Sequence, residues 1–121
     1  MKRKKPFNAT RKSVAALESD GWTVGNVESR IPHTFITRDL FNFADLIAVS
    51  PTRGIMLVQV TGGTGKSNFN ARVEKIKREA LAGIWLAAGG RIQVHSWETQ
   101  KNSKERTCRI LEMTKESHDN H

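Results

Sequence analysis

Two neighbouring apolar runs dominate the hydrophobic pattern of the chain. Residues 44–49 are apolar except for Asp45 and Ser50 follows them, whereas residues 54–61 stay apolar until Gln59 and Thr61. The short segment between the runs is rich in turn-forming residues, which is typical of a β-hairpin. Strands that are apolar on both faces are usually covered on both sides. The pattern therefore predicts a buried hairpin at the centre of a sheet.

The hairpin carries polar side chains at one end. The start of its first strand lies beside the end of its second, so Asp45 is expected close to Gln59. Gln59 and Thr61 share one face because side chains alternate along a strand. Buried polar groups need partners. This end of the hairpin is a candidate site, although Asp45 could instead brace a loop, Gln59 could be a satisfied buried amide, and Thr61 is a common strand residue.

The remaining pattern predicts an α/β fold in one domain. Apolar spacings of three and four predict a short helix over residues 11–20 and one long helix over residues 68–88. Alternation predicts strands over 22–28, 91–97 and 107–113, with a long connection over 29–42. A hairpin followed by a helical crossover gives a mixed sheet of about five strands with helices packed on it. The expected core face of the long helix is Phe69, Val73, Ile76, Ala80, Ile84 and Ala87.

Two terminal segments are expected to flank this domain, which covers residues 10–114. Residues 1–9 form a basic arm, and residues 115–121 form a flexible tail. The arm carries Lys2, Arg3, Lys4 and Lys5, which could lie along phosphates or remain a solvated tail.

Charge is the compositional feature that bears on function. The 121 residues have a formal net charge of +8, which favours a polyanionic partner, most simply nucleic acid. The alternative is a basic protein with no specific partner. No apolar run approaches the roughly 20 residues of a membrane span. A single cysteine, Cys108, fits a reducing, cytoplasmic setting without disulfides.

A glycine-rich segment after the hairpin, residues 62–67, ends in Gly65-Lys66-Ser67. A phosphate-binding P-loop would need a glycine where this chain has Val60, so that interpretation is not favoured. Lys66 and the backbone N–H groups of this loop could still contact a DNA phosphate. Arg72 and Lys75, in the first turns of the long helix, are expected to point back towards the loop.

The order of these elements resembles a known family. The chain is expected to contain, in order, a helix, a Gly-Trp-x-Val strand, an x-Asp-Leu-Ile-Ala strand, an apolar strand ending in Gln-x-Thr and a long helix. This order resembles the restriction-endonuclease-like core of the PD-(D/E)XK nucleases. The similarity is greatest to the small Holliday junction resolvase branch and related phage-type proteins. It implies a DNA endonuclease that acts as a homodimer on branched DNA, within a phage-infected or prophage-bearing bacterium.

The resemblance also implies a metal site and a catalytic set. Asp45 and Gln59 would hold Mg²⁺ or Mn²⁺, which lowers the pKa of a water and neutralises charge on the phosphate that is cut. Thr61 stands where the family has its lysine, and Gln59 stands where a carboxylate is usual. Lys66 or Lys75 could supply the missing positive charge.

Two further carboxylates, Glu28 and Asp39, could complete the metal site, although a lone acidic residue is more often simply a surface residue. The four histidines show no zinc-ligand spacing. His33 and His95 have no visible partner in the sequence, and we expect neither to be catalytic. Two hypotheses follow: an active metal-dependent endonuclease, or a nuclease-fold protein that has lost its chemistry and binds nucleic acid without cutting it.

Overall fold

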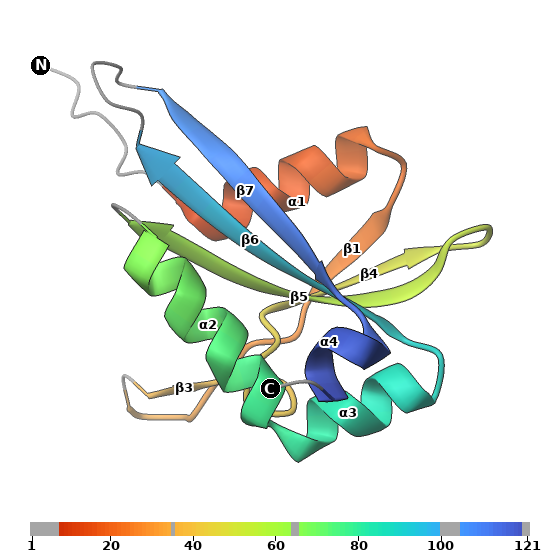
Figure 1. The fold of residues 1–121 in the computed structure, drawn as a ribbon. Coiled ribbons are helices and arrows are strands. Elements are labelled where there is room, and N and C mark those ends of the chain that lie inside the picture. Colours follow the sequence, from red (N-terminus) through yellow and green to blue (C-terminus); the bar gives the residue numbers. More distant parts are fainter. Residues whose placement is uncertain (1–7, 35, 64–65, 100–104, 120–121) are drawn as a thin grey trace, which may run out of the picture.

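The computed structural model describes residues 8–34, 36–63, 66–99 and 105–119. The described residues form seven strands and four helices, and five of the strands make one mixed sheet (Figure 1). In chain order the elements are α1 (Ala9–Ser19), β1 (Thr23–Asn26), β2 (Ser29–Arg30), β3 (Thr37–Arg38), β4 (Leu46–Ser50), β5 (Gly54–Gly63), α2 (Lys66–Arg78), α3 (Ala80–Ala87), β6 (Arg91–Thr99), β7 (Arg106–Met113) and α4 (Lys115–Asp119). The basic arm, including Lys2, Arg3, Lys4 and Lys5, lies outside the described residues apart from its end.

The predicted hairpin is confirmed at the centre of the sheet. The strand order is β1-β4-β5-β6-β7, and β4 pairs with β5 in antiparallel register. The segment between β5 and β6 contains α2 and α3, and β5 and β6 are parallel, as is usual for neighbouring strands joined by a helical crossover. β1 and β7 pair antiparallel at the two edges. The α/β class and the mixed five-stranded sheet are therefore as expected.

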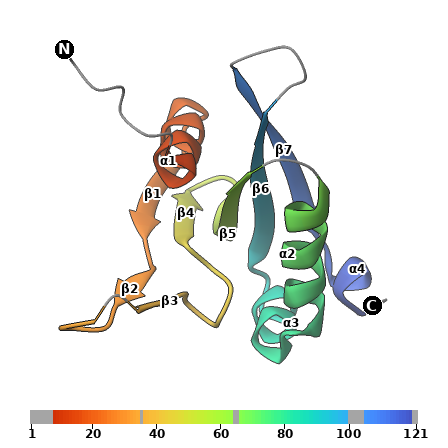
Figure 2. The same cartoon turned by 90° about the vertical axis from the view of Figure 1, so that its left-hand side faces the viewer.

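Helices cover both faces of the sheet (Figure 2). On one face, Leu17 of α1 packs with Trp22 and with Leu46 and Val58 of the hairpin. On the other face, a second apolar cluster joins the hairpin and β6 to α2 and α3. This double cover explains why both strands of the hairpin are apolar throughout. Among the described residues, no helix has the length and apolar character needed to cross a membrane.

The expected single long helix is wrong, because the chain breaks at Glu79. Glu79 is extended (φ −85°, ψ 114°), and its side chain accepts a hydrogen bond from the Leu81 backbone N–H, so it caps a new helix, α3. The break changes which positions face the sheet. Val73 and Ile76 are buried as expected, but Ile84 is 63% exposed and the buried residue of α3 is Ala82. α2 itself begins at Lys66, earlier than predicted.

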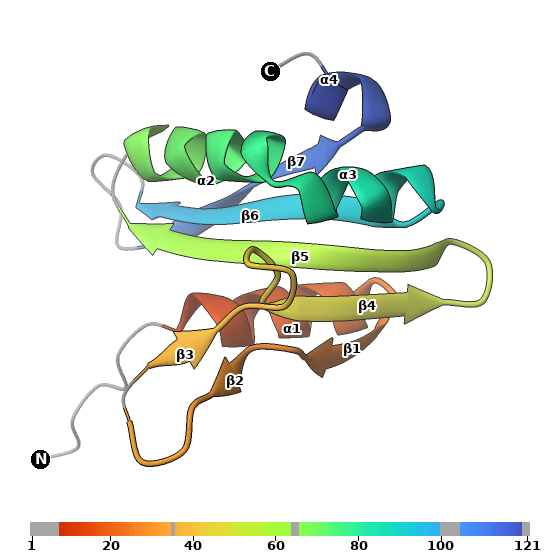
Figure 3. The ribbon, with the colours of Figure 1, turned by 90° about the horizontal axis from the view of Figure 1, so that it is seen from below.

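Two segments expected to be irregular contain secondary structure. The long connection of residues 29–42 contains the antiparallel pair β2–β3, which stands beside the main sheet (Figure 3). The expected flexible tail contains α4, whose His118 is buried and whose Nε2 lies 3.1 Å from the Glu79 carbonyl oxygen. The α4 helix therefore packs against the junction of α2 and α3. The short N-terminal helix is confirmed, with Asn8 as its cap.

Candidate metal centre

Three carboxylates from separate segments converge where β4 begins. One oxygen each of Glu28, Asp39 and Asp45 lies within 4.8 Å of the others. Asp45 is buried, Asp39 is half-buried and Glu28 is exposed. We call these three residues the acidic cluster. Both carboxylates that the sequence offered only as optional additions to Asp45 are therefore beside it.

A tight loop brings Asp39 next to Asp45. Leu40 and Ala44 form a β-bridge, with the Ala44 N–H 2.9 Å from the Leu40 carbonyl oxygen. Asp39 and Asp45 are the next pair beyond this bridge. Closing the loop requires positive φ at two residues that are not glycine, Phe41 (53°) and Asn42 (69°). Such conformations cost free energy and persist where the surrounding structure enforces them, often at functional sites.

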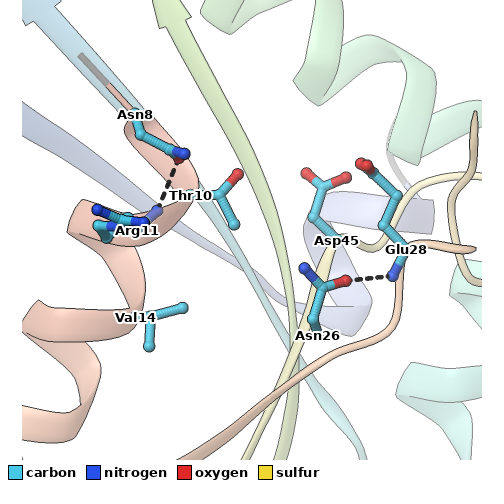
Figure 4. A pocket seen from close by; sticks show the side chains of 7 residues that line it. All are labelled: Asn8, Thr10, Arg11, Val14, Asn26, Glu28 and Asp45. Atoms are coloured by element: carbon cyan, nitrogen blue, oxygen red, sulfur yellow. Dashed lines mark hydrogen bonds between the residues drawn. The ribbon is translucent and has the colours of Figure 1, made fainter. Parts of the chain in front are cut away.

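Glu28 is positioned by the end of β1. The backbone N–H of Val27 donates to the Asp45 carbonyl oxygen at 3.0 Å, which continues the pairing of β1 with β4 by one residue. The Asn26 side-chain oxygen then accepts from the Glu28 backbone N–H at 2.9 Å (Figure 4). This local hydrogen bond turns the chain so that the Glu28 carboxylate lies beside that of Asp45.

The neighbouring strand β5 holds Asp45 on one of its oxygens. Gln59 Nε2 donates to Asp45 Oδ2 at 3.0 Å, and the Val60 backbone N–H donates to the same oxygen at 2.8 Å. The predicted contact between Asp45 and Gln59 is therefore confirmed. Both donors reach Oδ2, and neither of these two hydrogen bonds uses Oδ1.

Gln59 carries an orphaned oxygen. Its side chain is only 2% exposed, and Oε1 is buried without a hydrogen-bond partner among the described residues. The amide cannot be reversed to satisfy this oxygen, because Nε2 faces two acceptors, Asp45 Oδ2 and the Val60 carbonyl oxygen at 3.4 Å. A buried unsatisfied acceptor is costly and needs an explanation.

The electrostatics of the cluster disfavour three negative charges. Burial is the main cause that raises the pKa of Asp45 to about 8; the Val60 N–H opposes the rise, and the nearby carboxylates of Asp39 and Glu28 add to it. A proton therefore remains on Asp45 near neutral pH when nothing else neutralises the cluster. Carboxylate and amide oxygens are the ligands that hard divalent cations prefer. The acidic cluster with Gln59 therefore has the donor set to hold such an ion.

Open space adjoins the acidic cluster on two sides. A pocket of about 450 Å³ separates the start of α1 from the cluster and is lined by Asn8, Thr10, Arg11, Val14, Asn26, Glu28 and Asp45 (Figure 4). A second hollow, of about 530 Å³, is lined by Thr37, Arg38, Asp39, Asn42 and Lys75. We call them the α1 pocket and the β3 hollow. The acidic cluster contributes residues to both.

The other predicted site residues have different positions. Thr61 is buried two residues beyond Gln59, and among the described residues it makes none of the hydrogen bonds that hold Asp45. Lys66 begins α2, but its side chain lies outside the described part of the structure. Lys75 is close to the site, with Nζ 4.0 Å from Asp39 Oδ2. Arg72 is half-buried on the same helix and lines neither of the two spaces.

Sequence reasoning missed the polar lining contributed by Asn26, Thr10 and Arg11. Asn26 precedes Glu28 by two residues, a spacing at which an Asn side chain commonly bonds the backbone and forms a turn. That signal was present but local. The approach of α1 to the cluster is a tertiary contact, for which the sequence carries no comparable signal.

A second group of polar side chains is buried away from the acidic cluster. Ser13 Oγ accepts a hydrogen bond from Trp97 Nε1 at 2.8 Å and lies 2.9 Å from His95 Nδ1. His95 Nε2 lies 2.9 Å from Gln93 Oε1. Gln93 Nε2 donates to Glu112 Oε1 at 3.1 Å, so Gln93 Oε1 accepts from His95 Nε2. In the neutral ring Nδ1 is then the acceptor, and the Ser13 hydroxyl donates to it. We call Ser13, Trp97, His95 and Gln93 the Ser13–His95 network.

The network corrects the expectation that His95 lacks a partner. His95 is 1% exposed, and burial lowers its pKa to about 4, so the ring is neutral near pH 7. Ser13 is fully buried and therefore out of reach of a substrate. The residues tie α1 to β6.

Comparison with protein-family models, curated proteins and solved structures found no match for this chain. The fold defines an α/β protein with a mixed five-stranded sheet. The site defines a group of three acidic residues that could hold a metal ion.

Proposed function

We propose that the protein is a metal-dependent DNA endonuclease with a restriction-endonuclease-like fold of the PD-(D/E)XK type. The observation that carries the proposal is the pair Asp45 and Gln59 on adjacent strands. Gln59 Nε2 donates to Asp45, its Oε1 is buried without a partner among the described residues, and oxygens of Glu28 and Asp39 lie within 4.8 Å of one of Asp45. An orphaned acceptor and a protonated carboxylate are both explained by a site that is complete only with a cation. The net charge of +8 supports a polyanionic substrate.

The residues present fit a Mg²⁺ or Mn²⁺ ion. Asp45 would supply the central ligand, and Glu28 and Asp39 supply the negative charge that Gln59 lacks. A bound ion would lower the pKa of a water molecule and neutralise charge on the phosphate. The protein orients these ligands through β4, β5 and the tight loop before β4. Lys75, 4.0 Å from Asp39, replaces the positive charge that Thr61 does not provide.

A second candidate is a nuclease-fold protein that binds DNA without cutting it. The observation that favours it is Thr61, which is buried and neutral at the position where the family has its lysine. Both candidates share the DNA partner. Cutting two strands of a branched substrate would require two copies of the chain, so the proposal includes a homodimer.

Cleavage assays with a matched variant test the proposal. Labelled duplex, single-stranded, flap and four-way-junction DNA would be incubated with Mg²⁺ or Mn²⁺ and with wild type, Asp45→Ala or the control Asp20→Ala. Asp20 is an aspartate whose side chain is 70% exposed at the end of α1. We expect metal-dependent cutting that only Asp45→Ala abolishes, with DNA binding retained.

The other outcomes are equally informative. Salt-sensitive binding without cutting of any substrate would favour the second candidate. Absence of both binding and cutting would contradict both candidates.

A further inference from the structure

The β3 hollow brings two cations from separate elements to the edge of the acidic cluster. Arg38 comes from β3 and Lys75 from α2, and both line the hollow together with Asp39. Lys75 is paired with Asp39 at 4.0 Å, whereas Arg38 is exposed and has no ion-pair partner among the described residues. A cation without a carboxylate partner, beside three clustered carboxylates, is available for an anion brought by a ligand.

The segment that carries Arg38 is basic and is anchored at the cluster. β2 begins directly after Glu28, and β3 ends directly before Asp39. A member of the cluster therefore adjoins each end of the β2–β3 pair. The sequence from Ser29 to Arg38 contains two arginines and no acidic residue. The pair stands apart from the main sheet in two views (Figures 2 and 3). A surface of this charge suits a phosphate backbone.

The arrangement of the two spaces gives a path for a strand. The α1 pocket is lined by Glu28 and Asp45, and the β3 hollow is lined by Asp39. Since oxygens of these three carboxylates lie within 4.8 Å of one another, the cluster forms the divide between the two spaces. A strand lying across the divide would place one phosphate at the cluster and its neighbour in the β3 hollow.

We infer that Arg38 and Lys75 form a phosphate-binding subsite, which holds the DNA phosphate next to the one at the acidic cluster. The inference rests on the proposed function and assigns its substrate contact. A divalent cation held by the cluster would neutralise the charge of Asp39. Lys75, which is paired with Asp39, would then be able to contact the phosphate. A free small anion would bind poorly here. The carboxylates of the cluster repel it when no cation is present, and it has no neighbouring phosphate that the cluster could hold.

Salt dependence of DNA binding tests the subsite. Binding of a fluorescent four-way junction would be measured in Ca²⁺ across a range of KCl concentrations, for wild type, Arg38→Gln, Lys75→Gln and the double variant. Each duplex phosphate contact contributes about 0.9 to the slope of log K against log salt. We expect each single variant to lower the slope by about 0.9 and the double variant by about twice that amount.

Lys115→Gln is the matched control, because Lys115 begins α4, which lies at the β7 edge of the sheet, whereas the β2–β3 pair lies at the opposite edge (Figure 3). It removes one positive charge and should leave the slope unchanged. Mn²⁺ affinity of Arg38→Gln should also equal that of wild type, because Arg38 contacts the phosphate and not the ion.

The outcomes separate the subsite from the proposed function. Wild type that cuts DNA, combined with variants whose salt slopes match wild type, would overturn the subsite and leave the endonuclease intact. A slope that falls equally in Lys115→Gln would also overturn it, since the effect would then reflect net charge alone. Wild type that neither binds nor cuts would overturn both.

Discussion

The acidic cluster and the Ser13–His95 network are both groups of polar side chains built around a buried member, Asp45 in one and His95 in the other, yet their chemistry is opposite. In the network, each donor meets an acceptor, from Trp97 through Ser13 to His95 and Gln93. In the cluster, oxygens of three carboxylates lie within 4.8 Å of one another, and Oε1 of Gln59, whose Nε2 contacts Asp45, has no partner in the described part of the chain. Burial of polar groups is therefore not itself a sign of function. Satisfied polar groups hold a structure together, whereas a surplus of acceptors of one sign needs an external cation.

The largest expected effect comes from breaking the network with Ser13→Ala. The substitution removes the hydroxyl that accepts from the Trp97 N–H and that donates to the buried His95 Nδ1, which should lower the free energy of unfolding by about 3 kcal/mol. Urea denaturation would measure it, with Ser19→Ala, an exposed serine on the same helix, as the control. Metal affinity of the folded variant should be unchanged. A loss of stability no greater than that of Ser19→Ala would show that the network does not contribute.

The second effect has the opposite sign. Asp45→Asn should raise the free energy of unfolding of the metal-free protein at pH 9 by about 2 kcal/mol, because it removes a charge that burial and neighbouring carboxylates oppose. Saturating Mn²⁺ should reverse the order of stability, since only wild type gains binding free energy from the ion.

Thermal unfolding of wild type and Asp45→Asn, with Mn²⁺ and with EDTA, would test this reversal. Asp20→Asn is the control and should show no response to the ion. If Asp45→Asn were the less stable protein in EDTA at pH 9, the carboxylate would be a structural brace and not a strained ligand.

The two regions should also respond to pH in opposite directions. His95 has a folded-state pKa of about 4, below its ordinary 6.5, so the unfolded chain binds the extra proton and stability is lost as pH falls from 6.5 towards 4. Asp45 has a folded-state pKa of about 8, above its ordinary 3.8, so the folded metal-free protein binds the extra proton. Its contribution is complete below pH 3.8 and is lost as pH rises towards 8.

Each group contributes at most about 1.4 kcal/mol per pH unit. Between pH 6.5 and 8 the decline of Asp45 should act without opposition from His95. Urea midpoints of the metal-free protein at pH 5, 6.5 and 8 would show it. Asp45→Asn should flatten the alkaline decline. Between pH 6.5 and 5 the two contributions oppose each other in wild type, so His95→Gln should leave a stability that rises as the pH falls. Equal pH profiles in all three proteins would contradict the assignment of these pKa values.

The smallest expected effect is a gain in metal affinity. Gln59→Glu places a fourth carboxylate at the cluster and should tighten Mn²⁺ binding about fivefold, or about 1 kcal/mol. Calorimetric titration would measure it, and Gln93→Glu, in the network, is the matched control. Unchanged affinity in Gln59→Glu would place the Gln59 side chain outside the ion's reach.

Sequence alone predicted the part of the site that depends on local pairing. Asp45 and Gln59 lie on consecutive strands, so alternation and a short turn were enough to place them opposite each other. Asp39 could not be placed in this way, because the loop that brings it to Asp45 uses left-handed Phe41 and Asn42 and contains no glycine to signal it.

The fold shows the same limit. Hydrophobic periodicity predicted the sheet and its helical cover, but it ran through Glu79 without a break. Glu79 is a good helix former, and only its capping contact with Leu81 ends one helix and begins the next. The partners of His95 were invisible because Ser13 and Trp97 reach it through tertiary packing.

The separation of these partners along the chain has a consequence for folding. Asp45 and Gln59 are 14 residues apart, whereas Ser13 is 82 residues from His95 and 84 from Trp97. The entropic cost of closing a loop grows with its length, so contacts between distant residues are rewarded late. Loop closure therefore favours assembly of the ion-binding residues before α1 docks. An ion present during synthesis would then act as a template around which the first half of the sheet is organised.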